Sequence, residues 1–309
     1  MRKISSAILL SILLIAPGCG TRQSTGISID RGIRRMIPPD SKAIAGIDVA
    51  ALKNTELYKR EGTRLNTPFL DSTAERFGLD PRRDIANVVM AWDGKKLLLI
   101  VQGHFSPAEL EQKLTAAGAH ETPYRKYKLV GDIKNSIAFL NSGLAIAGPL
   151  EAIEPAIDRF EEGHGGVPEN LSREMDKIPK GDQLWLASTG GLPFVEMRMR
   201  SDIESALSNI VDYISASSAG IKVDAGLHLQ AELDCVSQQG AKRVHDALRG
   251  VIGFGRLSTK DNETDLLRIY DSIQVDQKQQ IVLVRSDLTG DLVDVLLNRF
   301  LNPKPARAA

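Results

Sequence analysis

Two turn sequences, each between two apolar runs, constrain the fold of this chain more than any other feature. The runs Asn87–Ala91 and Lys96–Val101 flank Asp93-Gly94, and the runs Ser136–Leu140 and Leu144–Ala147 flank Asn141-Ser142-Gly143. Turns of this kind join neighbouring antiparallel strands, because glycine, asparagine and aspartate tolerate positive φ angles. We therefore expect two β-hairpins, and hairpins imply antiparallel sheets.

Helices alternate with these hairpins in the N-terminal half. Ser106-Pro107-Ala108-Glu109 predicts a helix start, because serine can cap, proline suits the first position and glutamate completes a capping box. This helix ends near Gly118. A second helix opens at Pro149 and carries its apolar side chains on one face. Strands and helices in this order indicate an α+β fold.

The C-terminal half has the same kinds of element. An apolar stripe from Met199 to Ile214 predicts a long helix over Leu192–Ser217. A further helix is expected to end near Ile252, and a last helix to close the chain. The expected strands are 221–223, 227–235, 266–275 and 280–285.

Three pairs of similar segments indicate an internal duplication. Ile37-Pro38-Pro39-Asp40 recurs as Ile178-Pro179-Lys180-Gly181-Asp182, Asp93-Gly94 as Ala225-Gly226, and Arg159-Phe160 as Arg299-Phe300, at offsets of 141, 132 and 140 residues. Such differences in offset are changes in loop length, which cost little entropy. The alternative is that two α+β halves share a pattern by coincidence.

The sequence thus predicts two tandem, duplicated α+β domains, each an antiparallel sheet with helices mainly on one face. The predicted boundaries are a signal peptide at 1–18, a lipidated N-terminus and flexible tether at 19–35, a first domain at 36–165, a linker at 166–177, a second domain at 178–302 and a disordered tail at 303–309.

The N-terminal residues predict export from the cytoplasm. Arg2 and Lys3 precede the apolar run Ala7–Ala16, and small or turn residues lead from there to Cys19. A charged start, a short apolar run and a small-residue cleavage site are typical of a signal peptide. The run of about ten residues is half of the ~20 that a bilayer-spanning helix needs.

The stretch Ala16-Pro17-Gly18-Cys19 resembles the lipobox of bacterial lipoprotein precursors. The resemblance implies that Cys19 becomes the first residue of the mature chain and carries a thioether-linked diacylglycerol with an amide-linked third chain. Several acyl chains together give a stable membrane anchor. Gly20 follows the cysteine in place of aspartate, which favours the outer membrane, facing the periplasm. Ordinary secretion is the alternative.

Charge and cysteine content agree with this interpretation. Loss of Arg2 and Lys3 leaves 37 basic against 39 acidic residues, a net charge of −2, which gives no support for a nucleic-acid partner or a polybasic membrane surface. Lipidation of Cys19 leaves Cys235 without a disulfide partner. Cys235 alternates with polar residues on its strand and is predicted to be a small buried hydrophobe.

No motif predicts catalysis, so we assign no catalytic, cofactor-binding or metal-binding residues. The five histidines lack the spacing of a helical zinc site, and the sequence lacks G-x-S-x-G. His228 lies opposite Leu227 and Leu229 on its strand, and a covered face there would make it the most interesting of the five. One basic-aromatic segment is the candidate partner contact, with a solvated strand edge as the alternative. Its residues are Tyr124, Arg125, Lys126 and Tyr127.

The segments IPPDSKAIAGIDVAALK, GLDPRRD and AWDGKKLLLIVQG resemble conserved lipoproteins of acidobacterial-type soil bacteria. No activity is assigned to that family, so the resemblance supplies no site residues. Our first hypothesis is a non-catalytic envelope lipoprotein that binds a protein or envelope partner. The alternatives are a protein that binds a small ligand in a cleft between the two domains, and a periplasmic hydrolase of unrecognised type.

Overall fold

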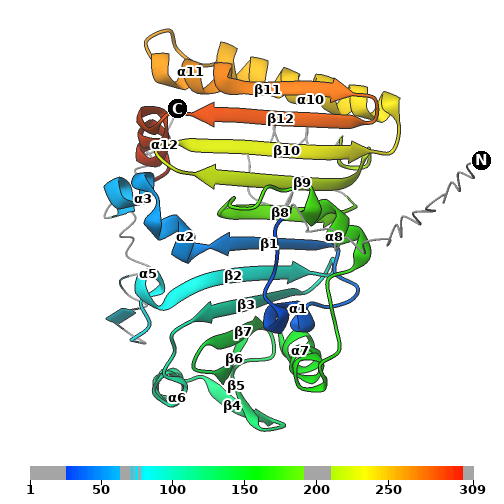
Figure 1. Cartoon of the computed structure of the whole chain (residues 1–309). Helices are drawn as coiled ribbons and strands as arrows, with labels where there is room; N and C mark the ends of the chain where they lie inside the picture. Colours follow the sequence, from blue (N-terminus) through cyan, green and yellow to red (C-terminus); the bar gives the residue numbers. More distant parts are fainter. Residues whose placement is uncertain (1–25, 63–70, 72–73, 76–77, 191–209, 302–309) are drawn as a thin grey trace, which may run out of the picture.

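The strands of the described chain form one antiparallel sheet of 12 strands (Figure 1). The computed structural model describes residues 26–62, 71, 74–75, 78–190 and 210–301. The strands lie in the order β11-β12-β10-β9-β8-β1-β2-β3-β7-β6-β5-β4. Helices pack on both faces of this sheet, so the α+β class is confirmed.

The strands have the following bounds: β1 (Ala43–Asp48), β2 (Ile85–Trp92), β3 (Leu97–Gly103), β4 (His120–Tyr124), β5 (Tyr127–Gly131), β6 (Ser136–Asn141), β7 (Leu144–Gly148), β8 (Leu184–Thr189), β9 (Ile214–Val223), β10 (Leu227–Cys235), β11 (Ile273–Lys278) and β12 (Ile281–Leu288). The helices are α1 (Arg31–Met36), α2 (Val49–Asn54), α3 (Glu56–Glu61), α5 (Pro81–Asp84), α6 (Pro107–Ala116), α7 (Leu150–Glu162), α8 (Glu169–Asp176), α10 (Gln238–Leu257), α11 (Thr264–Ser272) and α12 (Gly290–Leu301).

The two halves meet at a hydrogen-bonded seam between β1 and β8. The pairing is antiparallel and runs from Ala43 opposite Ser188 to Ile47 opposite Leu184. Outward from this seam the strands run β1-β2-β3-β7-β6 on one side and β8-β9-β10-β12-β11 on the other. The sequence predicts a separate sheet for each half, and the structure corrects this to one continuous sheet.

Both predicted hairpins are present. β2 and β3 pair from Trp92 opposite Leu97 outward, and β6 pairs with β7 across the Asn141-Ser142-Gly143 turn. In the first turn only Gly94 has a positive φ, of 105°. The carboxylate of Asp93 instead accepts hydrogen bonds from the backbone N–H groups of Lys95 (2.8 Å) and Lys96 (2.7 Å). The turn is thus closed by a side chain rather than by two positive φ angles.

The two faces of the sheet bury different helices. One face, which we call the α7 face, carries Ile44, Ile100 and Ile146 and packs against α1, α7 and α8. The opposite face, the α10 face, packs against α6 in the first half and against α10, α11 and α12 in the second. In Figure 1 α1 and α7 lie in front of the sheet, while α10 and α11 lie behind it. The first half therefore has helices on both faces, whereas the sequence predicts mainly one.

The segment predicted as a flexible tether belongs in part to the folded body. Residues from Gly26 onward are described, and Gly26 forms a β-bridge with Pro179. α1 follows, and its Ile33 and Met36 are fully buried in the core of the first half. Two buried side chains on a six-residue helix outweigh the polar character that indicates a tether. The described part of the folded body therefore reaches at least ten residues before the predicted start at residue 36.

The predicted linker at 166–177 is also part of the core. It contains α8, whose Leu171 and Met175 are 0% and 3% exposed and pack with Ile153 and Trp185. These two apolar side chains lie four residues apart, on one face of the helix. The other residues of this short segment are mostly polar, so the sequence pattern does not indicate a buried helix.

Two predicted elements in the second half change type. The helix predicted over 192–217 is wrong from Ile214, where β9 begins, and its residues 192–209 lie outside the described residues. Ile210 and Ile214 are both buried in one cluster, so a spacing of four residues fits a strand start as well as a helix. The strand predicted from Leu266 is wrong as far as Ser272, which ends α11.

The predicted tail at 303–309 lies outside the described residues. Cys235 is buried at 4% exposure, as predicted, and burial raises the pKa of its thiol.

The place of α1 in the core can be tested by removing one side chain. We expect Ile33→Ala to lower the free energy of unfolding by about 2–5 kcal/mol, because it leaves a cavity at a fully buried position. Arg34→Ala, on the exposed side of the same helix, should stay within about 0.5 kcal/mol of the wild type. Urea unfolding measures both. Equal stability of the two variants would contradict the packing of α1.

Candidate functional site

A groove lies on the α10 face of the first half. Its floor is apolar and comes from neighbouring strands, with Leu97 and Leu99 on β3, Val130 on β5, Ile137 on β6 and Ala147 on β7. Leu114 of α6 adds one wall. The groove encloses about 640 Å³, which is within the range of pockets that hold small organic ligands.

Three lysines surround this apolar floor. Lys95 and Lys96 come from the β2–β3 turn, and Lys134 comes from the β5–β6 turn. The residues that line the groove include these three cations and no carboxylate. Lys96 forms an ion pair of 3.7 Å with Asp93. Ile133, next to Lys134, is 72% exposed. The groove therefore combines an apolar floor with a cationic rim.

Two aspartates hold the turns that carry these lysines. Asp93 accepts from the backbone of Lys95 and Lys96, and Asp132 accepts from the backbone of Lys134 (2.8 Å) and Asn135 (2.7 Å). Burial opposes ionisation of Asp93, but the backbone N–H groups and the Lys96 amine outweigh burial and lower its pKa. Both turns are thus fixed by Asx hydrogen bonds, which present the lysines in a defined place.

The predicted partner contact at 124–127 forms the turn between β4 and β5. Its side chains bind the acidic residues of α7. The Tyr124 hydroxyl donates to Asp158 (3.0 Å), Arg125 pairs with Asp158 (2.6 Å) and Glu162 (2.9 Å), Lys126 pairs with Glu161 (3.1 Å), and Tyr127 binds Glu161. Burial, followed by Glu161, raises the pKa of Tyr127. The segment therefore attaches the β4–β5 hairpin to α7 through ion pairs and hydrogen bonds. A partner would have to compete with these internal bonds.

A charged cluster that the sequence did not reveal centres on Lys177. Its amine lies 3.0 Å from Glu174, 2.9 Å from Glu232 and 2.5 Å from Asp234. Burial lowers the pKa of this amine, but the three carboxylates outweigh burial and raise it. Burial raises the pKa of Glu174, which is 6% exposed. The amine joins the end of α8 to β10 across more than fifty residues of chain, a separation that no sequence motif records.

The cavity beside Lys177 is small. It encloses about 110 Å³ and is lined by Gln230, Glu232 and Arg285 among others, well below the volume that organic ligands occupy. We therefore interpret the Lys177 cluster as a structural contact between the two halves rather than as a ligand site.

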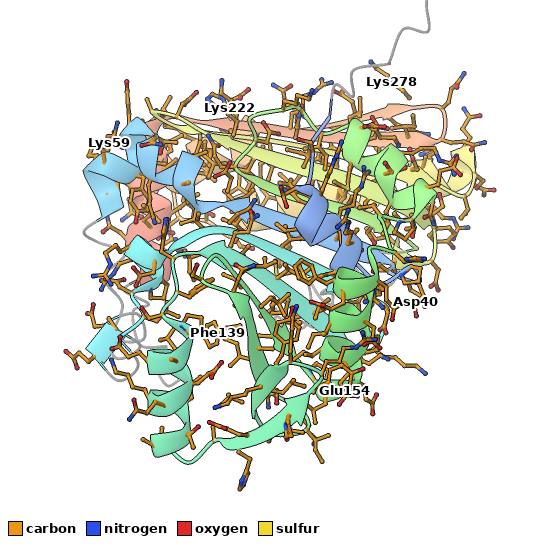
Figure 2. All side chains as sticks on the ribbon, turned by 60° about the horizontal axis from the view of Figure 1, so that its bottom comes forward. Asp40, Lys59, Phe139, Glu154, Lys222 and Lys278 are labelled. Carbon is orange, nitrogen blue, oxygen red and sulfur yellow. The ribbon has the colours of Figure 1, made fainter. Side chains whose placement is uncertain are left out.

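His228 lies between two carboxylates on the α7 face of the second half. Its Nδ1 is 2.7 Å from Asp287 and its Nε2 is 3.2 Å from Asp224. The hydrogen bond with Asp287, followed by that with Asp224, outweighs partial burial and raises the pKa of the imidazole. Lys222 of β9 lies opposite His228 in the register and is exposed (Figure 2). With 44% of the side chain exposed, His228 is a surface ion pair rather than a covered site.

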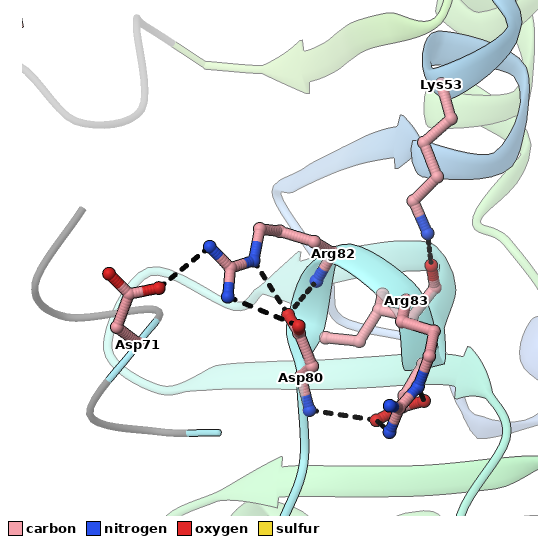
Figure 3. A network of polar contacts seen from close by, with 7 residues as sticks. Lys53, Asp71, Asp80, Arg82 and Arg83 are labelled. Atoms are coloured by element: carbon pink, nitrogen blue, oxygen red, sulfur yellow. Dashed lines mark hydrogen bonds and ion pairs between the residues drawn. The ribbon is translucent and has the colours of Figure 1, made fainter. Parts of the chain in front are cut away.

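The GLDPRRD segment has a structural role (Figure 3). Asp80 caps α5 by accepting from the Arg82 backbone at 3.0 Å, and the Arg82 guanidinium joins Asp80 to Asp71 at 2.9 and 2.8 Å. Arg83 pairs with Asp84 at 2.7 Å. The Arg83 side chain, followed by the Asp80 backbone N–H, outweighs burial and lowers the pKa of Asp84. These bonds fix the chain where it enters β2.

A second cavity lies at the seam, on the α7 face. It encloses about 260 Å³ and is crossed by residues 27–29 of the N-terminal segment. Trp185 lies over Gly46, where a Cβ atom would be 2.4 Å from the indole ring, so only glycine fits beneath it. The other lining residues are Asp48, Ala51, Asn87, Val89 and 180–183. This is the site that corresponds to the predicted cleft between the halves, and it is smaller than the groove.

Metal sites and membrane-spanning helices are both absent from the described residues. Among those residues, no group of three or more histidine, cysteine, aspartate or glutamate side chains is placed to hold a metal ion. No helix within them is long and apolar enough to cross a bilayer. Cys19 lies outside the described residues.

Comparison with known proteins gives a fold relationship. The chain is similar in fold to crystal structures of TP0453. Form III has a TM-score of 0.53 at 10% identity and covers 88% of this chain and 99% of that chain, and form I has a TM-score of 0.50 at 9% identity and covers 89% and 98%. At such identity the likeness concerns the fold alone. No protein-family model matches the chain, and no curated protein matches it.

The Lys177 cluster predicts a loss of stability when its cation is removed. We expect Lys177→Met to lower the free energy of unfolding by about 2 kcal/mol, because Glu174 is left buried beside two carboxylates without a cation. Lys180→Met, at an exposed position three residues on, should change it by less than about 0.5 kcal/mol. Adding Glu174→Gln to Lys177→Met should recover part of the loss. Urea unfolding that ranks Lys180→Met with Lys177→Met would contradict this role.

His228 predicts a pH-dependent contribution to stability. Its pKa in the folded chain is raised above 6.5, so the stabilisation is complete below that pH and is lost as the pH rises through the folded pKa. For a half-exposed pair we expect about 0.5 kcal/mol. His228→Asn should therefore be less stable than the wild type at pH 5.5 and equal to it at pH 8.5, measured by urea unfolding. His120→Asn is the control, and a difference that grows with pH would contradict the assignment.

Proposed function

We propose that this chain is a lipid-anchored envelope lipoprotein whose body is a non-catalytic binding module for an amphiphile with an anionic head group. The observation that carries the proposal is the groove of about 640 Å³ with an apolar floor and a rim of Lys95, Lys96 and Lys134. A ligand pocket that is mostly apolar with a few convergent polar groups is the common form of a small-molecule site.

The chemistry of the groove supports this ligand class. An alkyl chain laid on Leu97, Leu99 and Ile137 would leave water, and each buried methylene contributes about 0.8 kcal/mol. A carboxylate or phosphate at the end of that chain would meet ammonium groups at the rim, and charge-assisted hydrogen bonds of this kind are the strong ones. An anion would meet no carboxylate among the lining residues. A neutral or cationic ligand would offer no anion to the amines of the rim lysines.

The membrane anchor is the second part of the proposal. It rests on Ala16-Pro17-Gly18-Cys19 and on the signal peptide before it. With Cys19 lipidated, the body would be held at the outer membrane, facing the periplasm, where amphiphiles are abundant. Our first hypothesis from the sequence is a module that binds a protein or envelope partner. Such a partner would then meet the body at the membrane surface.

We also propose that the two halves derive from an internal duplication. The order of strands outward from the seam supports it, and so do Ile37 and Ile178, which are both buried and precede β1 and β8. α6 and α10 both cover the α10 face. α7 and α12, by contrast, lie on opposite faces of the sheet. The duplication therefore includes the strands, α6 and α10. It does not include the helices that end in Arg159-Phe160 and Arg299-Phe300.

Ligand binding can be tested with dodecanoate and dodecan-1-ol as probes in titration calorimetry. The triple variant Lys95→Gln/Lys96→Gln/Lys134→Gln should bind dodecanoate about tenfold more weakly, because three exposed charge pairs together contribute about 1.4 kcal/mol. Its affinity for dodecan-1-ol should not change. Ala147→Trp, which fills the floor, should weaken both.

The matched control is Lys222→Gln/Lys260→Gln/Lys278→Gln, which removes the same charge from exposed positions of the second half. It should bind both probes as the wild type does. Absence of dodecanoate binding to the wild type, or equal binding by the rim and control variants, would refute the groove as the site.

The anchor has an independent test. Intact-mass spectrometry of the protein purified in mild detergent from host envelopes should show a mature chain that begins at Cys19 with attached acyl chains, and Cys19→Ala should leave the membrane fraction. The same purification, run with both chains, identifies any protein that is retained with the lipidated form. A mature chain without lipid would exclude the anchor and leave ordinary secretion.

A further inference from the structure

α1 carries three arginines on one face and apolar residues on the other. Arg31, Arg34 and Arg35 are exposed and spaced i, i+3 and i+4, which places them side by side on the helix surface. Ile33 and Met36, on the opposite face, are fully buried. The buried face fixes the orientation of the helix, so the three guanidinium groups, which we call the α1 arginine face, point to solvent.

This arginine face lacks internal partners in the described part of the chain. None of its three side chains forms an ion pair there. Asp30, the adjacent carboxylate, caps α1 by accepting from the Gly32 backbone at 2.7 Å. By contrast, Arg125, Arg256 and Arg268 each pair with carboxylates at 2.6 to 3.2 Å. The α1 face is therefore free to bind an external anion.

The position of α1 in the chain points to the occupant. Gly26 is fixed to the body by its bridge to Pro179, and the Ile27 N–H donates to Met175. Gly26 follows Cys19 by seven residues, a stretch that spans at most about 25 Å. Arg31 follows Gly26 by five residues, which adds at most about 18 Å. A membrane that holds Cys19 would thus lie within reach of all three arginines.

We propose that the α1 arginine face docks on the anionic phospholipid head groups of the membrane that holds the lipid anchor. The proposal rests on the proposed anchor for the identity of that membrane. Guanidinium groups bind phosphate oxygens in a bidentate manner. The net charge of the whole chain gives no sign of a polybasic surface, but the three arginines of α1 form a local basic patch. A lipid chain and a basic patch are two signals that act together in membrane attachment. Docking would fix the α7 face of the sheet, on which α1 packs, in relation to the bilayer.

The test separates the arginine face from the lipid. The chain from residue 19 onward, with Cys19→Ser, keeps every described residue and carries no acyl group. Its partition onto vesicles of phosphatidylcholine with 30 mol% phosphatidylglycerol is compared with partition onto pure phosphatidylcholine by co-sedimentation. Each basic residue at an anionic surface contributes about fivefold in affinity, so Arg31→Gln/Arg34→Gln/Arg35→Gln should lose about 100-fold.

Arg249→Gln/Lys260→Gln/Lys278→Gln is the matched control, because it removes three charges from exposed positions of the second half. It should partition as the parent chain does. Equal partition of the parent onto both kinds of vesicle, or equal partition of the two triple variants, would overturn the proposal. Mass spectrometry of native Cys19 decides the anchor separately. A lipid-free Cys19 together with intact vesicle binding would refute the anchor and leave the arginine face. A lipidated Cys19 together with no preference for anionic vesicles would refute only the arginine face.

Discussion

The pairing of β1 with β8 is the interaction on which the rest of the structure depends. Each half would otherwise expose a strand edge, and an unpaired edge of this kind invites association with other chains. The antiparallel pairing from Ala43 to Ile47 closes both edges and makes one sheet. Helices that follow different strands then share one core, so α8, which precedes β8, packs with the helices of the first half. A hinge at the seam would have to break these backbone hydrogen bonds.

The N-terminal segment strengthens the same junction. Gly26 bridges to Pro179 just before β8, while α1, a few residues later, is buried on the first half. One short segment is thus attached to both halves. Lys177 does the same with charge, because its amine joins the end of α8 to two carboxylates of β10. Three different kinds of contact, backbone pairing, apolar burial and an ion-pair cluster, therefore hold the halves in one arrangement.

Local signals in the sequence predicted local structure, and the seam had no local signal. The Asp93-Gly94 and Asn141-Ser142-Gly143 turns gave correct hairpins, because a turn and its flanking strands are contiguous. Ile210 and Ile214 gave a wrong prediction of helix up to residue 217. A spacing of four residues suits a helix, and it also suits a helix end followed by a strand. The β1–β8 pair joins residues more than 130 positions apart, and no sequence motif in either strand indicates which strand it pairs with. The groove was invisible for the same reason, because its floor comes from four strands and its rim from two turns.

The two proposed surfaces lie on opposite faces of the sheet, and this arrangement has a consequence for function. The α1 arginine face belongs to the α7 face, whereas the groove opens on the α10 face of the same half. A body docked through α1 would therefore keep the groove directed away from the head groups it touches. Its ligand would then come from the aqueous side or from a partner rather than directly from the bilayer beneath. Charge leads to the same conclusion, because rim lysines that lay on an anionic membrane would be occupied by head groups and could not select a ligand.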